Sequence, residues 1–580
     1  MRIDSYLTVT SLGALAALAC AAPHAAAQST SIVSRASDGA PGGEYCGGAS
    51  LSGDGRLVVF HAGPGLVPND TNGVMDAFVH DRSTGTTRRV SVATDGAQAD
   101  GQTWDPRISA DGRFVVFASP ATNLVAGDTN AWEDVFRHDL LTGATVLVSV
   151  AAGGGPANHR SASPRTSADG RFVAFDSNAS NLVLGDANGL VADVFVRDME
   201  LGTTALVSLS ATGGQGNAWC QGAAISDDGR FVAFTAMASN LVPGDGNSAD
   251  DVFVRDLLLG TTSLVSRTPA GAPGNGESGA AIVSGDGRYV AFTSSANDLV
   301  ANDTNGAQDV FVYEIATGSM VRASLTPLGA QSTSGGFGPS ISHDGGRVAF
   351  VAGDGNLDPE DRNGFVDVFL RDLVAGTTEI ISLSTRDIRG TNFSTYPAIS
   401  GDGRHVGFES PADNLIDLAA PASRNVFVRD TLGCTTAIAA FCAGGTTSHG
   451  CSSTITASGD PSGTTGSGFT ITIGSIEGGK AGILFYGRTG PRATPFGGGS
   501  SLLCVLAPMQ RTGVQPTGGT PGGCDGTLTL DWNHFVTTHP AAQGVPFLGG
   551  QTVWVQGWFR DPLAPGGSNL SAALWFDVCR

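Results

Sequence analysis

Six short acidic segments recur along the chain, and each holds two aspartates and one asparagine at a nearly fixed spacing. Five of them read D-x-N-x-x-x-D, and the third has one extra residue before its second aspartate. Carboxylate and amide oxygens at alternate positions of a curled loop are ligands that calcium prefers in proteins. The pattern predicts calcium sites at Asp70, Asn72, Asp76; Asp128, Asn130, Asp134; Asp186, Asn188, Asp193; Asp245, Asn247, Asp251; Asp303, Asn305, Asp309; and Asp361, Asn363, Asp367.

A turn without metal is the alternative, because Asp, Asn and Gly are also turn residues whose side chains bond nearby amides. Two features favour the ion: the second aspartate keeps its place in all six copies, and uncompensated carboxylates repel one another. The segment from Asp128 also matches an EF-hand with Asp139 at position twelve. We expect that match to be false, since a strand rises about 3.3 Å per residue and carries Asp139 away from Asp134.

No residue pattern points clearly to catalysis. His80 and His138 each precede an aspartate, as a base and its orienting carboxylate do. Four other copies of the same segment have arginine at that position and one has Tyr313, so we interpret both histidines as substitutions on an outer strand. Paired carboxylates for glycoside cleavage stay open, because acids are many and their distances are unknown. The sequence therefore predicts a protein that is not an enzyme.

The acidic segments belong to a longer repeat marked by the signature S-x-D-G-R and its close variants. Its aspartates are spaced 57 to 59 residues apart, at Asp54, Asp111, Asp169, Asp228, Asp286, Asp344 and Asp402. Each unit predicts four short strands: one before the signature, an apolar one after it, one after the acidic segment, and one after a Thr-Gly turn. We expect the signature arginines, Arg56 to Arg404, to brace the sheets by pairing with carboxylates.

Each four-stranded sheet has an apolar face that a neighbouring sheet must cover. Seven such sheets therefore predict an all-β, seven-bladed β-propeller. A linear solenoid is the alternative, but it needs polar end caps that the sequence lacks. The stretch "TSIVSRASDG", residues 30–39, looks like a fourth strand without its first three. It could complete the last sheet and close the ring. Cys46 and Cys220 fall on first strands, where we expect thiols that line the central channel and are not bonded to each other.

The units "ISADGRFVVFAS" and "DVFRHDLLTG" resemble the WD-repeat-like blades of TolB-type bacterial propellers. The fuller unit "NLVxGDxNGxxDVFVRD" is similar to exported bacterial propellers that carry this additional loop. The resemblance covers residues 31 to about 433 and implies a binding scaffold. It assigns no activity, because fold alone does not settle function.

Residues 1–27 predict a signal peptide with an apolar stretch and a small-residue cleavage site, and a lipoprotein site at Cys20 is the alternative. No later segment is long and apolar enough to span a membrane. The net charge of −21 opposes nucleic-acid binding. We therefore expect an exported protein in the periplasm, at the cell surface or outside the cell, and expect it to be monomeric.

The repeat ends near Gly433, so we expect the propeller over residues 28–433 and a second β domain over residues 434–580. That second part predicts a small antiparallel sandwich pinned by disulfides among Cys434, Cys442, Cys451, Cys504, Cys524 and Cys579. Six cysteines leave the pairing open. "GGKAGILFYGRTG" and "VQGWFRDP" resemble a module found on many exported bacterial proteins. We expect Trp554, Trp558 and Trp575 to pack in its core rather than to stack on sugars.

These observations predict a calcium-stabilised propeller that binds a protein, peptide or polysaccharide ligand without catalysis. A polysaccharide lyase or glycosidase is the first alternative, and a structural component of the cell envelope is the second.

Overall fold

The computed structural model describes residues 28–577, apart from residues 41, 43–44, 354–355, 362, 385–386, 417–422, 432–438, 443, 445, 459–460, 462–468, 489–490, 496–501, 506, 540, 543–551, 562 and 564–567. The predicted signal segment, Cys20, Cys434 and Cys579 lie outside the described residues. The chain divides into two compact units, Gln28–Leu432 and Gly433–Arg580.

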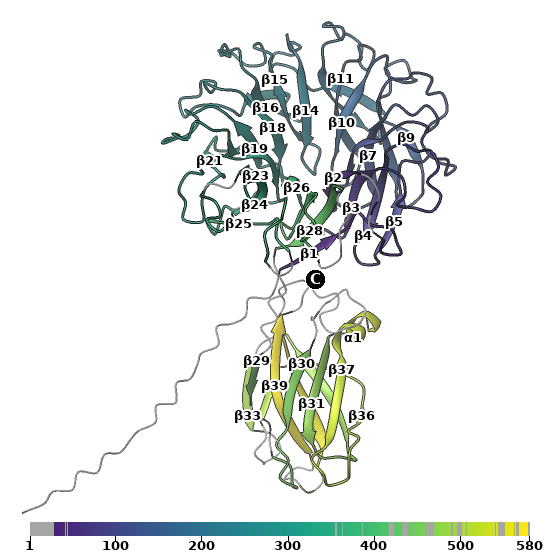
Figure 1. The fold of residues 1–580 in the computed structure, drawn as a ribbon, viewed down its shortest axis with the longest axis vertical. Helices are drawn as coiled ribbons and strands as arrows, with labels where there is room; N and C mark the ends of the chain where they lie inside the picture. Colours follow the sequence, from purple (N-terminus) through teal and green to yellow (C-terminus); the bar gives the residue numbers. More distant parts are fainter. Residues whose placement is uncertain are drawn as a thin grey trace, which may run out of the picture. The chain divides into compact units, whose positions relative to one another are not determined.

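The first unit is the predicted seven-bladed β-propeller, built from seven antiparallel sheets of four strands (Figure 1). Blades one to three are β2 (Cys46–Leu51), β3 (Leu57–Ala62), β4 (Asp76–Asp81), β5 (Thr86–Arg89); β6 (Trp104–Ile108), β7 (Phe114–Ser119), β8 (Asp134–Asp139), β9 (Thr145–Leu147); and β10 (Ser161–Thr166), β11 (Phe172–Ser177), β12 (Asp193–Asp198), β13 (Thr203–Leu206). Blades four and five are β14 (Cys220–Ile225), β15 (Phe231–Ala236), β16 (Asp251–Asp256), β17 (Thr261–Leu264); and β18 (Ser278–Val283), β19 (Tyr289–Ser294), β20 (Asp309–Glu314), β21 (Met320–Arg322). Blades six and seven are β22 (Phe337–Ile341), β23 (Arg347–Gly353), β24 (Val366–Asp372), β25 (Thr377–Ile380); and β26 (Thr395–Ile399), β27 (His405–Ser410), β28 (Asn425–Asp430), β1 (Ser29–Ile32).

The N-terminal strand closes the ring, as the sequence predicts. β1 pairs antiparallel with β28, so the start of the propeller supplies the outer strand of the last blade. The first strands of neighbouring blades contact one another all the way round, and β26 of blade seven meets β2 of blade one. A closed ring leaves only short protected sheet edges.

The signature residues shape the first hairpin of each blade. In blade one, Asp54 Oδ1 accepts hydrogen bonds from the Ser52 hydroxyl at 2.6 Å and from the Arg56 amide at 2.9 Å. Gly55 between them has a φ of 68°, which the tight turn requires and which glycine adopts without strain. The same serine–aspartate bond recurs in all seven blades.

The signature arginines brace the sheets, as predicted. Each pairs with the acidic residue at the end of the third strand of its own blade. The pairs are Arg56–Asp81, Arg113–Asp139, Arg171–Asp198, Arg230–Asp256, Arg288–Glu314, Arg347–Asp372 and Arg404–Asp430. Asp139 therefore serves a strand-bracing arginine, 2.7 Å away, and is no calcium ligand of an EF-hand.

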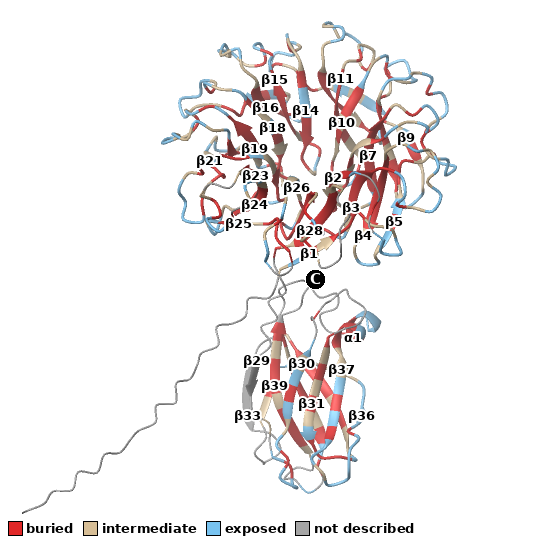
Figure 2. Cartoon of the chain, viewed as in Figure 1, coloured by how far each residue is buried: buried red, intermediate tan, exposed pale blue. Residues whose placement is uncertain are grey.

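Apolar side chains from adjacent blades form each section of the propeller core. One cluster joins Val59 and Val79 of blade one to Val115 and Phe117 of blade two, and all four are buried. Phenylalanines of the second and third strands stack within every blade, as Phe117 does on Phe136 with ring centres 5.8 Å apart. Figure 2 shows buried residues along the sheets and exposed residues in the loops around them.

The second unit is a β domain with two main sheets and one described helix. One sheet has the order β29 (Ala439–Cys442), β39 (Ser568–Asp577), β38 (Thr552–Arg560), β32 (Ala481–Gly487), β35 (Met509–Arg511), with β36 (Gln515–Pro516) also paired to β32. The other elements are the sheet β30 (Thr454–Ser458), β31 (Thr470–Ile476), β37 (Gly526–Asp531); the hairpin β33 (Pro491–Pro495), β34 (Leu502–Val505); and α1 (Trp532–Thr538).

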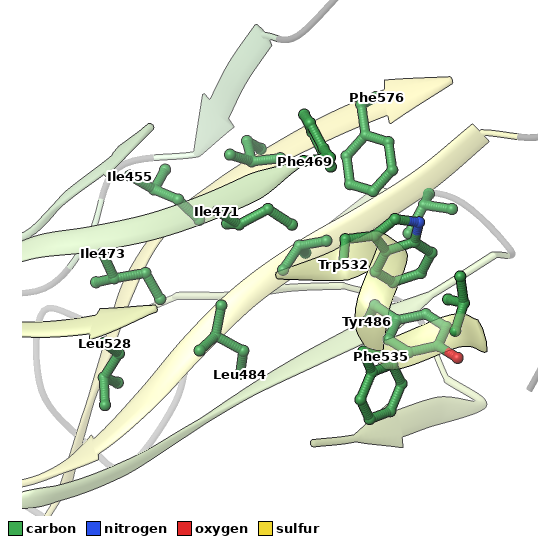
Figure 3. Close-up of a cluster of buried hydrophobic side chains, with 14 of the residues drawn as sticks. Ile455, Phe469, Ile471, Ile473, Leu484, Tyr486, Leu528, Trp532, Phe535 and Phe576 are labelled. Atoms are coloured by element: carbon green, nitrogen blue, oxygen red, sulfur yellow. The ribbon is translucent and has the colours of Figure 1, made fainter. Parts of the chain in front are cut away.

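Both main sheets of this domain contribute to one apolar core (Figure 3). Trp532 of α1 lies fully buried within it, against Tyr486 and Phe576. Trp554 and Trp558 are half-buried and pack against a smaller cluster around Val505. The described helix is too short and too polar to cross a membrane.

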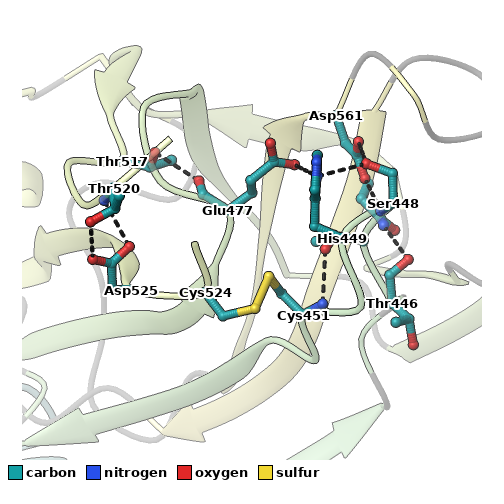
Figure 4. Close-up of a disulfide and its surroundings, with 12 residues drawn as sticks. Thr446, Ser448, His449, Cys451, Glu477, Thr517, Thr520, Cys524, Asp525 and Asp561 are labelled. Atoms are coloured by element: carbon teal, nitrogen blue, oxygen red, sulfur yellow. Dashed lines mark hydrogen bonds and ion pairs between the residues drawn. A yellow bond between two sulfur atoms is a disulfide. The ribbon is translucent and has the colours of Figure 1, made fainter. Parts of the chain in front are cut away.

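A disulfide joins Cys451 to Cys524 (Figure 4). Cys504 is also disulfide-bonded. Ser448, His449 and Asp561 lie close to the Cys451–Cys524 bond and suggest a catalytic triad by their residue types. The Ser448 hydroxyl, however, donates to Asp561 at 2.6 Å, and His449 faces Glu477 at 3.3 Å. His449 Nδ1 also lies 3.3 Å from Ser448 Oγ. The same ring nitrogen therefore faces both the serine and the acid, whereas a triad histidine contacts the serine through one nitrogen and the acid through the other, so this arrangement is structural.

Candidate functional site

The second aspartate of each acidic segment has a structural task in the blade. Asp134 is fully buried at the start of β8 and accepts hydrogen bonds from Ser149 at 2.6 Å and from Asn130 Nδ2 at 2.8 Å. The serine–aspartate bond recurs in all six loops, and so does the asparagine–aspartate bond. The fixed place of this aspartate therefore has an explanation within the protein.

The asparagines are also engaged inside the protein. Asn130 Nδ2 donates a second bond to the Ala157 carbonyl, and its Oδ1 accepts the Trp132 amide at 2.7 Å. Among the described residues, no cluster of three or more acidic, histidine or cysteine side chains could hold a metal. Burial raises the pKa of Asp134 and Asp251 to about 6 and that of Asp367 to about 7. The structure thus brings the two aspartates of each segment together but uses the asparagine as a brace.

His80 and His138 occupy a position at which other blades have arginine, and they make the same contact as that arginine does. His138 Nδ1 lies 2.8 Å from Thr145 Oγ1, and His80 makes the same contact with Thr87. In blade four, Arg255 donates to Thr262 Oγ1 at 2.9 Å from the same position. Burial lowers the pKa of both histidines to about 4. Both are structural residues.

Cys46 and Cys220 are buried thiols, and burial raises the pKa of each to about 12. Our expectation that they line the central channel is wrong. Cys46 packs with Val33 and Leu66, and Cys220 packs with Ala223 and Leu241, so both belong to the apolar core. The position before the bulge described next points between sheets, not into the channel.

A β-bulge interrupts the first strand of all seven blades, and sequence reasoning missed it. One residue of each bulge has positive φ: Gly48, Asp105, Ser163, Gly222, Ala280, Gly338 and Tyr396. Four of these are not glycine and adopt a conformation that costs energy for an L-residue. Bulges turn side chains in new directions and are frequent next to active sites. Glycine at this position in three of seven copies was the signal in the sequence.

Three side chains that could bind a ligand or transfer a proton lie close to Gly48, the residue of the first blade's bulge that has positive φ. Its amide donates to Glu409 Oε1 at 2.5 Å, and its carbonyl accepts from Arg107 Nη1 at 3.2 Å. A Cβ atom on Gly48 would lie 2.6 Å from His61 Nδ1. We call Gly48, His61, Asp105, Arg107, Arg165 and Glu409 the bulge site. These residues come from blades seven, one, two and three.

Glu409 and His61 of the bulge site are both buried. Glu409 is 2% exposed, and burial raises the pKa of its carboxyl although Arg424 lies 3.2 Å away. Burial lowers the pKa of His61 to about 4, so its ring is neutral at pH 7. His61 Nδ1 has no hydrogen-bond partner among the described residues. A neutral imidazole with an unused ring nitrogen can accept a proton or bind a donor.

Arg107 and Arg165 bring two positive charges to the bulge site, beside the carboxylates of Asp105 and Glu409. Each donates to backbone carbonyls, Arg107 to Gly48 and Arg165 to Pro164. No carboxylate of the described residues forms an ion pair with either guanidinium, although Asp105 attracts both from a longer distance. Burial, and after it repulsion from Arg107, lowers the pKa of Arg165 to about 9. Such a pair of arginines can bind a carboxylate with little competition from within the protein.

The second strands add further charge at a single register position. His61, Asp176 and Glu409 directly follow the core phenylalanine of their strands, where the other blades have Ala118, Thr235, Thr293 and Val351. Asp176 is buried, and burial raises its pKa to about 6. Charged residues inside an otherwise apolar strand were the signal that could have identified this site from the sequence.

Aromatic rings border the same first strands. Tyr45 stacks on His61 with ring centres 5.9 Å apart, and Trp104 meets the His61 ring edge at the same distance. Tyr45 and Tyr396 are exposed, by 43% and 64%. Trp132 is also exposed and stacks on His159 at 4.1 Å. Exposed aromatic faces next to polar groups are typical of sites that bind ligands through stacking.

No family model and no curated protein matches the chain. Among solved structures, it is similar to an oligogalacturonate lyase from Vibrio parahaemolyticus, with 12% identity, a TM-score of 0.41, and coverage of 70% of this chain and 91% of that one. A protein assigned as TolB from Agrobacterium tumefaciens has 18% identity and a TM-score of 0.33, covering 60% of this chain and 94% of that one. An acylaminoacyl peptidase from Pyrococcus horikoshii has 11% identity and a TM-score of 0.38, covering 63% of this chain and 49% of that one.

These likenesses extend to the propeller fold alone. They nevertheless correct one prediction. We expected a protein that is not an enzyme, but structures of enzymes, a lyase and a peptidase, are among those with a related propeller. The prediction that excluded catalysis is therefore corrected to a fold that is compatible with an enzyme, and activity must be argued from this chain's own residues.

Proposed function

We propose that the propeller binds a carboxylated polysaccharide at the bulge site and cleaves it, as a polysaccharide lyase. The observation that carries this proposal is the pair Arg107 and Arg165, two half-buried guanidinium groups without an ion-pair partner among the described residues. The pair brings two positive charges together in a chain whose net charge is −21. It favours a ligand with separate carboxylates over a polyphosphate, which would be repelled by the rest of the surface.

The surroundings of the arginine pair favour a sugar as the carrier of the carboxylate. Tyr45 and Trp104 flank His61, and aromatic faces stack well on the apolar faces of sugar rings. Planar guanidinium groups can bind a carboxylate through two parallel hydrogen bonds, which also fixes its orientation. A uronic acid residue would thus be held by its carboxylate and its ring.

The reaction that suits these groups is β-elimination. Arg107 and Arg165 neutralise the uronate carboxylate, which makes the proton on the adjacent carbon more acidic. Neutral His61 accepts that proton, the bond from the next carbon to the glycosidic oxygen breaks, and a carbon–carbon double bond forms. The leaving oxygen takes a proton from Asp176, whose pKa burial raises to about 6. Glu409 holds the Gly48 backbone and so positions the site.

A glycosidase would use two carboxylates across the scissile bond instead of an arginine pair. The two reactions can be distinguished by their products, because elimination yields an unsaturated uronate that absorbs ultraviolet light and hydrolysis does not. The test is a panel of neutral and uronate-containing polysaccharides. We expect the absorbance to rise only with uronate substrates. New reducing ends without absorbance, or turnover of neutral glycans alone, would contradict the proposal.

We also propose that the protein acts outside the cytoplasm. The Cys451–Cys524 bond supports this, because disulfides persist in oxidising compartments. A polysaccharide substrate does not cross membranes, so the protein would encounter it outside the cytoplasm. Fractionation of cells that produce the full chain tests this, and recovery in the cytoplasm would contradict it.

A further inference from the structure

The six acidic loops differ in what faces their two aspartates. In blade one, Arg89 of β5 lies between them, with Nη2 at 2.9 Å from Asp70 and Nε at 3.2 Å from Asp76. In blade five, Arg322 occupies the same strand position, 3.2 Å from Asp303 and 3.8 Å from Asp309. Both arginine side chains are 6% exposed. These two loops therefore already contain a buried cation from the chain itself.

Blade three fills the same place with a neutral donor. Its strand position holds Leu206, but Gln215 reaches in from the following loop. Gln215 Nε2 donates to Asp186 at 2.9 Å and to Asp193 at 2.8 Å. The two aspartates of blade three are thus bridged without a charge.

Blades two, four and six lack such a bridge among the described residues. The position of Arg89 is taken by Leu147, Leu264 and Ile380, each paired with the core phenylalanine of the third strand. The position of Gln215 is taken by Pro156, Pro273 and Arg389. Arg389 turns to Asp358 and Glu360 instead, at 2.9 and 3.0 Å. Each of these loops therefore holds two neighbouring carboxylates, and none of its described side chains bonds to both.

Two further observations mark the loops of blades two and six as incomplete. In blade two, Asp128, Leu147 and Pro156 line a cavity of about 380 Å³. Asp128 is 8% exposed, yet its Oδ1 has no hydrogen-bond partner among the described residues. Asp361 Oδ2 in blade six is in the same state, in a residue that is 7% exposed. A buried carboxylate oxygen without a donor carries a large desolvation cost.

We infer that the loops of blades two, four and six each hold one calcium ion, between Asp128 and Asp134, Asp245 and Asp251, and Asp361 and Asp367, whereas the loops of blades one, three and five hold none. Where the chain supplies Arg89, Arg322 or Gln215, the aspartates are already bridged. Where it supplies Leu147, Leu264 or Ile380, a hard divalent cation replaces the missing donor. Two carboxylates, backbone carbonyls and water match calcium's preference for oxygen ligands. With so few charged ligands, we expect affinities on the order of 0.1 to 1 mM.

The number of bound ions tests the inference directly. The full chain is stripped with a chelator and titrated with calcium by calorimetry and by thermal melting. We expect three ions per chain and a melting temperature that rises with calcium. Six ions would mean that the arginine-bridged loops also bind, and no ions would mean that all six loops are metal-free turns. Either number overturns the inference.

Exchange of the bridging residue between blades is the sharper test. Leu147→Arg gives blade two the bridging arginine of blade one, and it should lower the number of bound calcium ions from three to two. Leu206→Arg is the matched control in blade three, where Gln215 already bridges, and should leave three. The reverse change, Arg89→Leu, should create a fourth site. If Arg89→Leu does not fold, Leu147→Arg still decides, because three ions retained in that variant would overturn the inference.

Discussion

The Glu409 carboxylate of the last blade accepts a hydrogen bond of 2.5 Å from the backbone amide of Gly48 in the first blade. The two residues come from opposite ends of the propeller sequence and meet where the ring closes. The bond holds the bulge of β2 in place, and that bulge positions Arg107 and His61. Ring closure and the geometry of the bulge site are therefore linked.

Glu409 variants separate its hydrogen bond from its charge. Glu409→Gln keeps an oxygen for the Gly48 amide but removes the ion pair with Arg424. Glu409→Ala removes both and leaves a buried donor without a partner, which costs about 1 to 3 kcal/mol more. Denaturation with urea should rank the free energy of unfolding as wild type, then Gln, then Ala. Equal losses for the two variants would mean that the Gly48 bond contributes nothing.

The pH dependence of turnover should be bell-shaped on the acidic side of neutrality. Burial lowers the pKa of His61 to about 4, so the base is lost below that pH. Burial raises the pKa of Asp176 to about 6, so the acid is lost above that pH. We expect kcat/KM to be highest between these values, since it reports groups of the free enzyme. Asp176→Asn should abolish the alkaline limb, and an unchanged profile in that variant would exclude Asp176 as the acid.

His138→Arg restores the residue that other blades have and should preserve the fold. An arginine in this position donates to the following threonine, as Arg255 does to Thr262. The folded pKa of His138 is lowered from 6.5 to about 4, so its protonation opposes folding increasingly as pH falls from 6.5 to 4. Each pKa unit is worth roughly 1.4 kcal/mol. His138→Arg should therefore lose less stability than wild type between pH 7 and pH 4, as measured by urea denaturation at each pH.

The control for this experiment is His138→Ala, which loses the bond to Thr145 as well as the titrating group. It should be less stable than His138→Arg at every pH. If His138→Arg shows the same acid sensitivity as wild type, the lowered pKa of this histidine has no part in it.

The seven signature arginines should differ in their contribution to stability. Arg404 and Asp430 are 10% and 14% exposed and lie 2.6 Å apart, whereas Arg288 and Glu314 are 58% and 23% exposed and 3.5 Å apart. Breaking a buried pair leaves an unpaired charge and costs about 3 to 5 kcal/mol. An exposed pair contributes at most about 1 kcal/mol. Arg404→Gln should thus lower the free energy of unfolding far more than Arg288→Gln, and equal effects would contradict this ranking.

The architecture was predictable because it rests on patterns that repeat seven times. The signature at Asp54 and its six equivalents fixes the hairpins, and residues 30–39 match an outer strand that lacks its blade. Repetition averages out local ambiguity, so blade count, strand order and ring closure all follow. The bracing role of Arg56 and its equivalents also follows. In each unit an arginine lies at or just before the start of the second strand and an acid ends the third, and antiparallel pairing of these strands brings the two side chains together.

The bulge site was not predictable in the same way, because it depends on residues that depart from the repeat. His61, Asp176 and Glu409 occupy one register position, but only the ring brings residues of blades seven and one together. Cys46 was misplaced for a related reason. The bulge shifts the register within β2, so a residue expected to face the channel turns into the core.

Binding of a uronate oligosaccharide by the arginine variants tests the central claim most directly. Arg107→Gln and Arg165→Gln are compared with wild type and with Arg288→Gln, which removes an exposed arginine just before β19. Calorimetry should show affinity reduced at least about tenfold in each bulge-site variant, as expected for the loss of a charge-assisted hydrogen bond. Arg288→Gln should bind as wild type does. If both bulge-site variants bind as tightly as wild type while remaining folded, the site proposed here does not bind the carboxylate.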